Sequence, residues 1–227
     1  MATSTKRAER RADALSRQRI VDAAIEILDA DGENALTFRA LAARLATGAG
    51  AIYWHIASKD ELLKTAASDV IARALAGVAQ TGPGETIRAI ALGVFDTIET
   101  RPWVGTQLSR EPWQFAVTEI FEGFGRQLQA LGVPQAALFD SASALLSYVL
   151  GLAGQVAASA RLLAGETDRS AFLATTASRW AQLDPAQYPF VHQMAAQLAG
   201  HDDRQQFLAG IDLILAGLAA VRVRAGP

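Results

Sequence analysis

The sequence has no cysteine and only three histidines among its 227 residues. A chain without cysteine can form no disulfide, no thiolate metal site and no cysteine nucleophile, and it suits a reducing cytoplasm. The histidines, His55, His192 and His201, belong to no HExxH zinc motif, and the sequence contains no GxSxG nucleophile motif. We therefore expect no metal, no cofactor and no enzymatic activity. An enzyme that binds a metal through His192 and His201 is the first alternative.

Patterns typical of strands, signal peptides and membrane spans are scarce as well. No segment sustains the alternation of apolar and polar residues that marks a strand, whereas Ala, Leu, Gln, Arg and Glu predominate, and this composition predicts an all-α fold. The N-terminus lacks the apolar segment of a signal peptide. The longest apolar stretch, 142–158, is shorter than the roughly 20 residues of a bilayer span. We expect a buried helix there and a cytoplasmic protein.

Charge is distributed unevenly although the formal net charge is only −2. The first 20 residues hold six Lys or Arg against two acids, and the remainder of the chain is acidic on balance. A basic arm over residues 1–15 ahead of an acidic body is an electrostatic feature suited to a phosphate backbone. Surface charge that is merely solvated is the alternative interpretation.

The first 80 residues predict three helices followed by a longer one. Helix-capping residues and breakers place the first helix at Ser16 to Ala30, a short helix after the cap residue Thr37, and a second short helix at about Ala49 to His55. Ser58 with Glu61 three positions later forms a capping box that starts a long helix from Lys59 to about Gln80. Two short helices after a longer one are the plan of a helix-turn-helix.

Three segments of this region resemble the DNA-binding domain of the TetR family. They are Leu36–Leu45, Ala51–Ile56, which contains Tyr-Trp-His-Ile, and Ser58–Leu63. The resemblance implies a helix-turn-helix domain over 16–64 and a larger helical domain over 65–227 for ligand binding and dimerisation. It further implies a transcriptional repressor that binds double-stranded operator DNA as a homodimer and is released by a small molecule. The alternative is a helical scaffold or ligand-binding protein without sequence-specific DNA binding.

The candidate DNA-binding residues follow from this resemblance and from side-chain chemistry. Phenol, imidazole and ammonium groups at the end of the third helix and the start of the next suit phosphate oxygens, and an arginine at the start of the second helix suits a guanine edge. The predicted set is Thr37, Arg39, Ala49, Gly50, Ala51, Tyr53, His55 and Lys59. We expect Arg39 to be the main base reader, because the third helix offers only small residues. We expect Trp54 to pack against the first helix.

The turn before the third helix departs from the family pattern. Where the family commonly has a glycine, a hydrophobic residue and a polar cap, this chain has Ala46, Thr47 and Gly48. We expect a differently built turn in which Thr47 is the cap.

Heptad-like spacing of apolar residues predicts a dimer interface in the C-terminal half. The last helix repeats apolar residues at intervals of four and three, and a long helix over Gln135–Leu163 shows the same pattern. The segment Phe207–Leu218 also resembles the last dimerisation helix of the tetracycline repressors. The predicted interface residues are Leu145, Val149, Leu152, Val156, Phe207, Ile211, Ile214 and Leu218. Core packing within one subunit is the alternative role of these residues.

An aromatic-rich stretch with scattered polar groups predicts a ligand site between these regions. Drug-sized ligands bind in mostly apolar cavities with a few polar anchors. The predicted ligand-binding residues are Trp103, Gln107, Trp113, Phe115, Tyr148, Leu152 and Gln155. Gln107 aligns with a metal-binding histidine of the tetracycline repressors, so we expect an apolar or aromatic inducer rather than a magnesium-tetracycline complex. Packing in the core is the alternative role for most of these aromatics.

Overall fold

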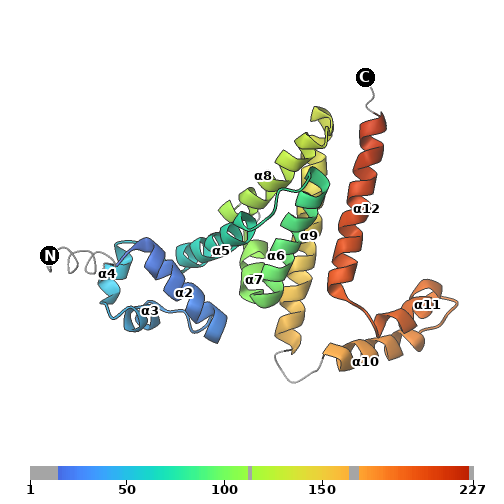
Figure 1. Cartoon of the computed structure of the whole chain (residues 1–227). Helices are drawn as coiled ribbons and strands as arrows, with labels where there is room; N and C mark the ends of the chain where they lie inside the picture. The colour runs from blue at the N-terminus through green and yellow to red at the C-terminus, as the bar shows by residue number, and fades with distance from the viewer. Residues whose placement is uncertain (1–14, 112–113, 164–168, 225–227) are drawn as a thin grey trace.

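The computed structural model describes residues 15–111, 114–163 and 169–224, and all its regular elements within these ranges are α-helices. The predicted all-α fold is confirmed. Figure 1 shows a small group of helices at one end, joined by one long helix to a larger helical body. The small group consists of α2 (Arg17–Asp31), α3 (Phe38–Arg44) and α4 (Ala49–Tyr53), and the joining helix is α5 (Lys59–Ala76). We call α2, α3 and α4 the head.

Local capping explains where α2, α3 and α5 begin. The Ser16 side chain accepts a hydrogen bond from the backbone N–H of Arg19, and Thr37 does the same for Ala40. Ser58 caps α5 by accepting from the N–H of Glu61. These three starts agree with the sequence prediction. The end of α5 does not: the helix stops before Gly77 rather than near Gln80.

The body is a bundle built around α6. Helix α6 packs against α5, α7, α8, α9 and α12, whereas α10 and α11 pack mainly against each other. The body helices are α6 (Pro83–Thr100), α7 (Pro102–Arg110), α8 (Phe115–Ala130), α9 (Gln135–Leu163), α10 (Arg169–Ala181), α11 (Pro189–Leu198) and α12 (Asp203–Arg224). Fully buried side chains such as Ile87, Phe124 and Phe207 form the core between them. Burial of this apolar surface is the main favourable term in folding.

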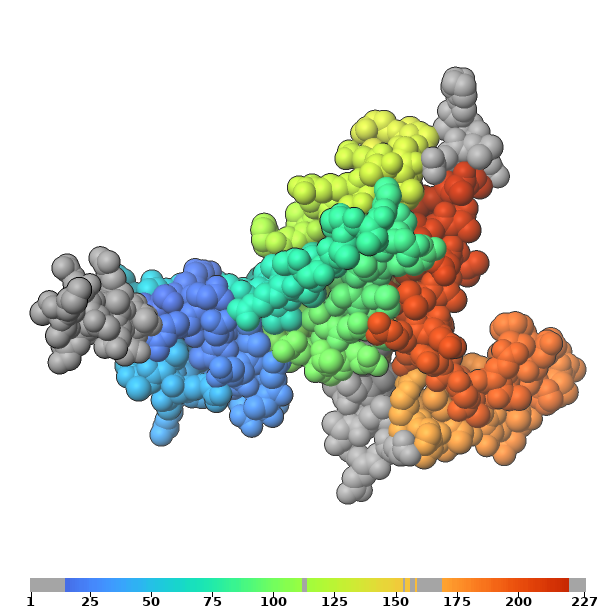
Figure 2. All heavy atoms as spheres, viewed as in Figure 1, coloured from blue at the N-terminus to red at the C-terminus, as the bar shows by residue number. Residues whose placement is uncertain are grey.

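Helices α10 and α11 form a hairpin that projects from the body. Their most extensive packing is with each other, and Figure 2 shows them standing out beside α12. By length and composition, one stretch of the described chain, Gln135–Leu152 in α9, also meets the criteria for a membrane span. Core helices of soluble proteins meet the same criteria, and Leu145 and Val149 of this stretch are buried in the bundle.

Candidate nucleic-acid interface

The turn between α3 and α4 places a non-glycine residue in the left-handed region. Ala46 has φ 50°, and it follows the last residue of α3 and its cap, Leu45. The N–H of Thr47 donates to the carbonyl of Ala42 at 2.9 Å, and the N–H of Ala46 donates to that of Ala43 at 3.3 Å. This pair of bonds is the Schellman arrangement, which usually carries glycine at the left-handed position. The turn therefore keeps the geometry of a glycine turn, with alanine in its place.

This strain gives a first testable prediction. A left-handed conformation costs an L-residue roughly 1–2 kcal/mol, while glycine adds about 0.4–1 kcal/mol of unfolded-state entropy. Ala46→Gly is therefore expected to raise the free energy of unfolding by roughly 0.5–1 kcal/mol. Chemical denaturation checks the result. Ala43→Gly, inside α3, is the control and is expected to destabilise the protein. A lower stability of Ala46→Gly would contradict the assigned strain.

Helix α4 begins at Ala49, as the sequence predicts, but its N-cap differs from the prediction. Gly48, not Thr47, is the N-cap, and its position has no side-chain cap bond. The expectation that Thr47 caps this helix is wrong, because the Thr47 N–H already takes part in the turn that ends α3. The third helix thus presents Gly50 exposed, with Ala49 and Ala51 half-buried. Over Ala49, Gly50 and Ala51, the outer surface of α4 consists of backbone and methyl groups.

Arg39 lies exposed on the first turn of α3, beside the cap residue Thr37. Within the described ranges Arg39 has no ion-pair partner, whereas Arg44, at the other end of the same helix, pairs with Glu26 at 2.7 Å. The Arg39 guanidinium is therefore available for an external partner. Thr37 is exposed as well, although its hydroxyl oxygen is engaged in capping.

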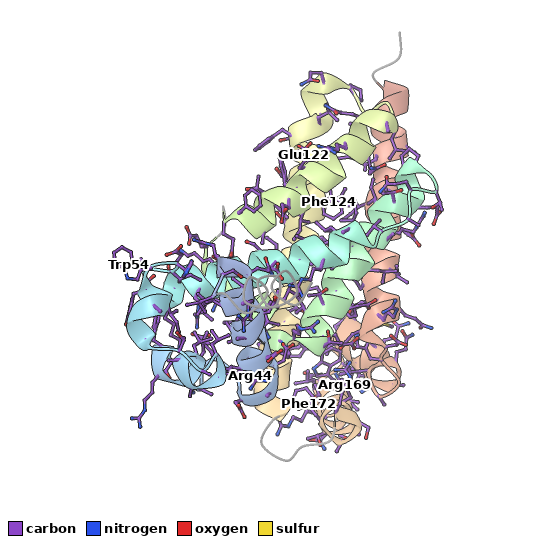
Figure 3. The ribbon with its side chains drawn as sticks, turned by 60° about the vertical axis from the view of Figure 1, so that its left-hand side comes forward. Arg44, Trp54, Glu122, Phe124, Arg169 and Phe172 are labelled. Atoms are coloured by element: carbon purple, nitrogen blue, oxygen red, sulfur yellow. The ribbon has the colours of Figure 1, made fainter. Side chains whose placement is uncertain are left out.

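Two aromatic residues end α4 and face outward. Tyr53 is 55% exposed and stacks on Phe38, with 4.3 Å between the ring centroids. Trp54 is 90% exposed, and Figure 3 shows it pointing away from the head. The expectation that Trp54 packs against the first helix is wrong. Ile52 takes the buried position of this turn, and the next two residues, Tyr53 and Trp54, point to solvent. Trp54 is therefore an exposed aromatic residue beside the predicted DNA-binding residues, and the sequence prediction did not include it among them.

The two other predicted phosphate contacts lie close by but are partly engaged. The Lys59 ammonium donates to the backbone carbonyl of Glu33 at 2.7 Å, and the His55 side chain is half-buried. An ammonium has three donors, so Lys59 retains donors for a phosphate. The structure thus brings seven of the eight predicted residues to α3 and α4 or their ends, and the eighth, Lys59, begins α5.

The junction between α4 and α5 is held by Glu61. Its carboxylate accepts from the N–H of Ala57 at 2.9 Å and from Arg17 at 2.7 Å. The hydrogen bond from Ala57, followed by that from Arg17, lowers the pKa of the Glu61 carboxyl below its ordinary value. This stabilisation is present above the ordinary pKa and is lost as the pH falls through the lower pKa of the folded state.

The predicted ligand-binding residues that the structure describes lie on three helices, α7, α8 and α9. Trp103 and Gln107 are buried on α7 and donate hydrogen bonds to Asp29 and Glu33 near the end of α2. Phe115 is 67% exposed on α8. On α9, Tyr148 and Leu152 are half-buried and Gln155 is exposed, while Trp113 lies outside the described residues.

A cavity of about 370 Å³ lies elsewhere in the body, between α5, α6 and α8. Leu75, Val78 and Ile90 supply apolar wall, and polar residues include Glu119 and Arg126. One Glu119 carboxylate oxygen is buried without a hydrogen-bond partner among the described residues, and burial raises the pKa of this carboxyl. The cavity therefore combines apolar walls with a buried acceptor. Across the described chain no group of three or more His, Asp or Glu is placed to hold a metal ion.

The predicted dimer seam faces inward in the subunit. Leu145, Val149, Phe207, Ile211 and Leu218 are buried, and Leu152 and Ile214 are half-buried. The side chain of the eighth predicted residue, Val156, lies outside the described part. These residues join α9 to α12 and to the rest of the core. The alternative interpretation, core packing within one subunit, thus describes their placement in the single chain.

Away from this seam, α9 and α12 each have an exposed face built mostly of small residues. On α9 this face consists of exposed Ala144, Ser147, Gly151 and Gln155. On α12 it consists of exposed Ala209, Leu213, Ala216 and Ala220. Leu213 is 75% exposed. These two helices are fixed to each other where Tyr148 lies over Gly210: a Cβ at Gly210 would meet the Tyr148 hydroxyl oxygen at 2.1 Å. The Tyr148 hydroxyl also donates to the carbonyls of Gln206 and Phe207.

A strained turn between two short helices, an outward-facing arginine and aromatic pair, and a helical body together define a helix-turn-helix DNA-binding protein. Comparison with known families agrees. Residues 20–66 match the sequence profile of bacterial regulatory proteins of the tetR family, and residues 106–222 match that of the tetracyclin repressor-like C-terminal domain. The chain belongs to the TetR family of transcriptional regulators. Members of this family are generally transcription factors rather than enzymes.

Solved structures share the whole fold. The transcriptional regulator SCO7222, a TetR from Streptomyces coelicolor, is 51% identical with a TM-score of 0.83, and the match covers 92% of this chain and 100% of that chain. Apo ActR of the same organism is 22% identical with a TM-score of 0.77, covering 93% and 98%. This second likeness shows the fold alone.

Among curated relatives, an HTH-type transcriptional regulator of Saccharopolyspora erythraea is 31% identical over 143 residues, which are 60% of this chain and 59% of that protein. The chain thus spans less than two thirds of that relative. The HTH-type transcriptional repressor DrrR1 of Streptomyces coeruleorubidus is 27% identical over 216 residues, covering 90% and 77%.

Proposed function

We propose that this protein is a homodimeric transcriptional repressor that binds operator DNA through its two heads and is released by a small molecule. Residues 16–64 form the DNA-binding domain and 65–227 the ligand-binding and dimerisation domain, and the protein acts in the cytoplasm. The observation that carries this proposal is the exposed end of the helix-turn-helix, where Arg39, Tyr53 and Trp54 have outward-facing side chains. The name of DrrR1 supports repression.

In the complex, α4 enters the major groove. Because Gly50 and its alanine neighbours carry no hydrogen-bonding side chain, the backbone comes close to the bases and methyl contacts to thymine take the place of hydrogen bonds. Arg39 reads a base edge, and Tyr53, Trp54 and Lys59 contact the phosphate backbone. Phosphate contacts set the position of the head, while Arg39 and DNA shape supply sequence preference.

Dimerisation uses the exposed faces of α9 and α12. Two copies of this pair form a four-helix bundle about a two-fold axis, and the small residues let the helices approach closely. The buried seam predicted from sequence then supports this interface from inside the subunit. A dimer is required because one short recognition helix makes few contacts, whereas two heads reach successive major grooves about 34–36 Å apart.

The inducer is an apolar or aromatic compound that binds in the body. The cavity beside α5 supports this, because its volume is near the lower end of the roughly 300–1,000 Å³ typical of ligand sites and α5 leads directly to the head. ActR, which shares the fold, has been solved in complex with actinorhodin. Binding that favours one body conformation moves α5 and the heads with it, and the coupling is reciprocal.

The test is binding to a duplex from the region upstream of the protein's own gene, measured over a range of salt concentrations. Affinity is expected to fall as salt rises, with a log–log slope of about −0.9 for each phosphate that a lysine or arginine neutralises. Scrambled duplex of equal length is the control for specificity. Absence of binding to any duplex at low salt would favour the helical scaffold, which the uncharged outer face of α4 otherwise supports.

A further inference from the structure

Asp29, near the end of α2, is bound by two side chains of the body. Its carboxylate accepts from Trp103 Nε1 at 2.8 Å and from Arg101 Nε at 2.9 Å. Trp103 is buried, and a buried indole N–H needs a hydrogen-bond acceptor because water cannot reach it; Asp29 is this acceptor. Arg101 and Trp103 flank the first residue of α7. This contact therefore ties the head to the start of α7.

Glu33 makes a second contact just beyond α2. Its carboxylate accepts from Arg110 at 2.9 Å and from Gln107 Nε2 at 3.3 Å. Gln107 is buried, and Arg110 is the last residue of α7. The two carboxylates thus hold both ends of one helix of the body. We call Asp29 and Glu33 with their four partners the α2–α7 latch.

The latch is separate from the attachment that α5 provides. Along α2, Asp22 pairs with Arg73 and Gln18 bonds to Asp69, both on α5. A single helix leaves the head free to turn about it when that helix bends. A second attachment, from α7, removes this freedom. The latch joins the head to α7, and α7 packs against α5, α6 and α9. The head is therefore connected through α7 to α9, which bears part of the proposed dimer face.

We propose that Asp29 and Glu33 are positioning residues that set the orientation of the head on the body and therefore the half-site spacing that the dimer accepts. This inference rests on the proposed function. In the dimer each body is fixed to its partner, so the direction in which each head points determines the distance between the two recognition helices. Trp103 and Gln107, predicted as ligand-binding residues, act in this scheme as hydrogen-bond donors that orient the head.

The experiment compares operators that differ only in the spacing between half-sites. Starting from the bound duplex, one base pair is added or removed at the centre, which shifts one half-site by about 3.4 Å and rotates it by about one tenth of a turn. The wild-type dimer is expected to lose about tenfold or more in affinity. Asp29→Asn with Glu33→Gln is expected to lose about threefold or less, because heads that are less firmly held adapt to the altered site.

Matched variants separate orientation from stability. Trp103→Phe removes the N–H that Asp29 accepts and keeps an aromatic side chain, although phenyl is smaller than indole. It tests the latch if the double variant does not fold, and Trp180→Phe controls for the aromatic exchange. Asp96→Asn breaks an ion pair to Arg204 within the body, and Trp180→Phe makes the same aromatic exchange on α10. Both controls are expected to keep the wild-type spacing preference. A merely structural role would lower stability without changing this preference.

The outcomes distinguish this inference from the function on which it rests. If wild-type protein binds no duplex, the proposed function fails. If wild-type protein binds with a clear spacing preference and Trp103→Phe and the double variant keep it unchanged, the latch does not position the heads. Equal loss of affinity at every spacing would also overturn the inference, because it would mark Asp29 and Glu33 as groups that support DNA contact rather than orientation.

Discussion

Leu213→Glu is expected to be a monomer that binds operator DNA at least about 100-fold more weakly than the wild type. Leu213 is 75% exposed on α12, on the face that we assign to the dimer. Burying an unpaired carboxylate in an apolar interface costs several kcal/mol, and every 1.4 kcal/mol is tenfold in affinity. The two-fold axis places this charge in the interface twice. Sedimentation and DNA titration measure the two effects.

Two controls define what this result means. Leu213→Met retains an apolar side chain of similar volume and is expected to stay dimeric. Phe115→Glu introduces the same charge at another exposed large side chain, on α8 rather than on the α9 and α12 face, and is also expected to stay dimeric. A dimeric Leu213→Glu protein would exclude this face of α12 as the interface.

The second large effect is expected from Arg39→Ala. A bidentate contact between arginine and a guanine edge contributes about 1–3 kcal/mol of discrimination, and the dimer makes it twice. Loss of Arg39 is thus expected to weaken operator binding by about 30-fold or more while changing affinity for scrambled duplex far less. Competition titrations at one salt concentration measure the ratio of the two affinities.

Arg44→Ala is the matched control for this experiment. Arg44 lies on the same helix but is paired with Glu26, so its loss is expected to leave the ratio of specific to scrambled affinity unchanged. If Arg39→Ala weakens both duplexes equally and reduces the salt dependence of binding, Arg39 contacts phosphate and does not read bases.

Local chemistry explains what could be predicted from the sequence. The starts of α2, α3 and α5 were predictable because Ser16, Thr37 and Ser58 cap them with their own side chains, within three residues. Helix α9 over Gln135–Leu163 followed from apolar spacing in the same way. Helix α4 also begins at Ala49 as expected, but its cap was not predictable, because the Thr47 N–H takes part in the backbone turn at Ala46 and Gly48 takes the N-cap position.

Contacts between distant residues explain what could not be predicted. The hydrogen bonds from Trp103 to Asp29 and from Gln107 to Glu33 each join residues 74 positions apart, and neither partner carries a local signal of the other. An aromatic or amide residue in an apolar stretch suits a ligand cavity and an interdomain contact equally well. The sequence therefore predicted Trp103 and Gln107 as ligand-binding residues, without showing which residues they contact.

The bare surface of α4 bears on how this regulator can change its targets. A Cβ added at Gly48 or Gly50 meets no atom within 4 Å, and neither residue has the left-handed φ that disfavours side chains. New side chains can therefore be installed on the recognition helix by single substitutions without rebuilding the core beneath it. Side chains introduced at Gly50 can contact DNA bases and change the sequence preference. A small set of Gly50 substitutions is therefore a direct way to retarget the protein in the laboratory.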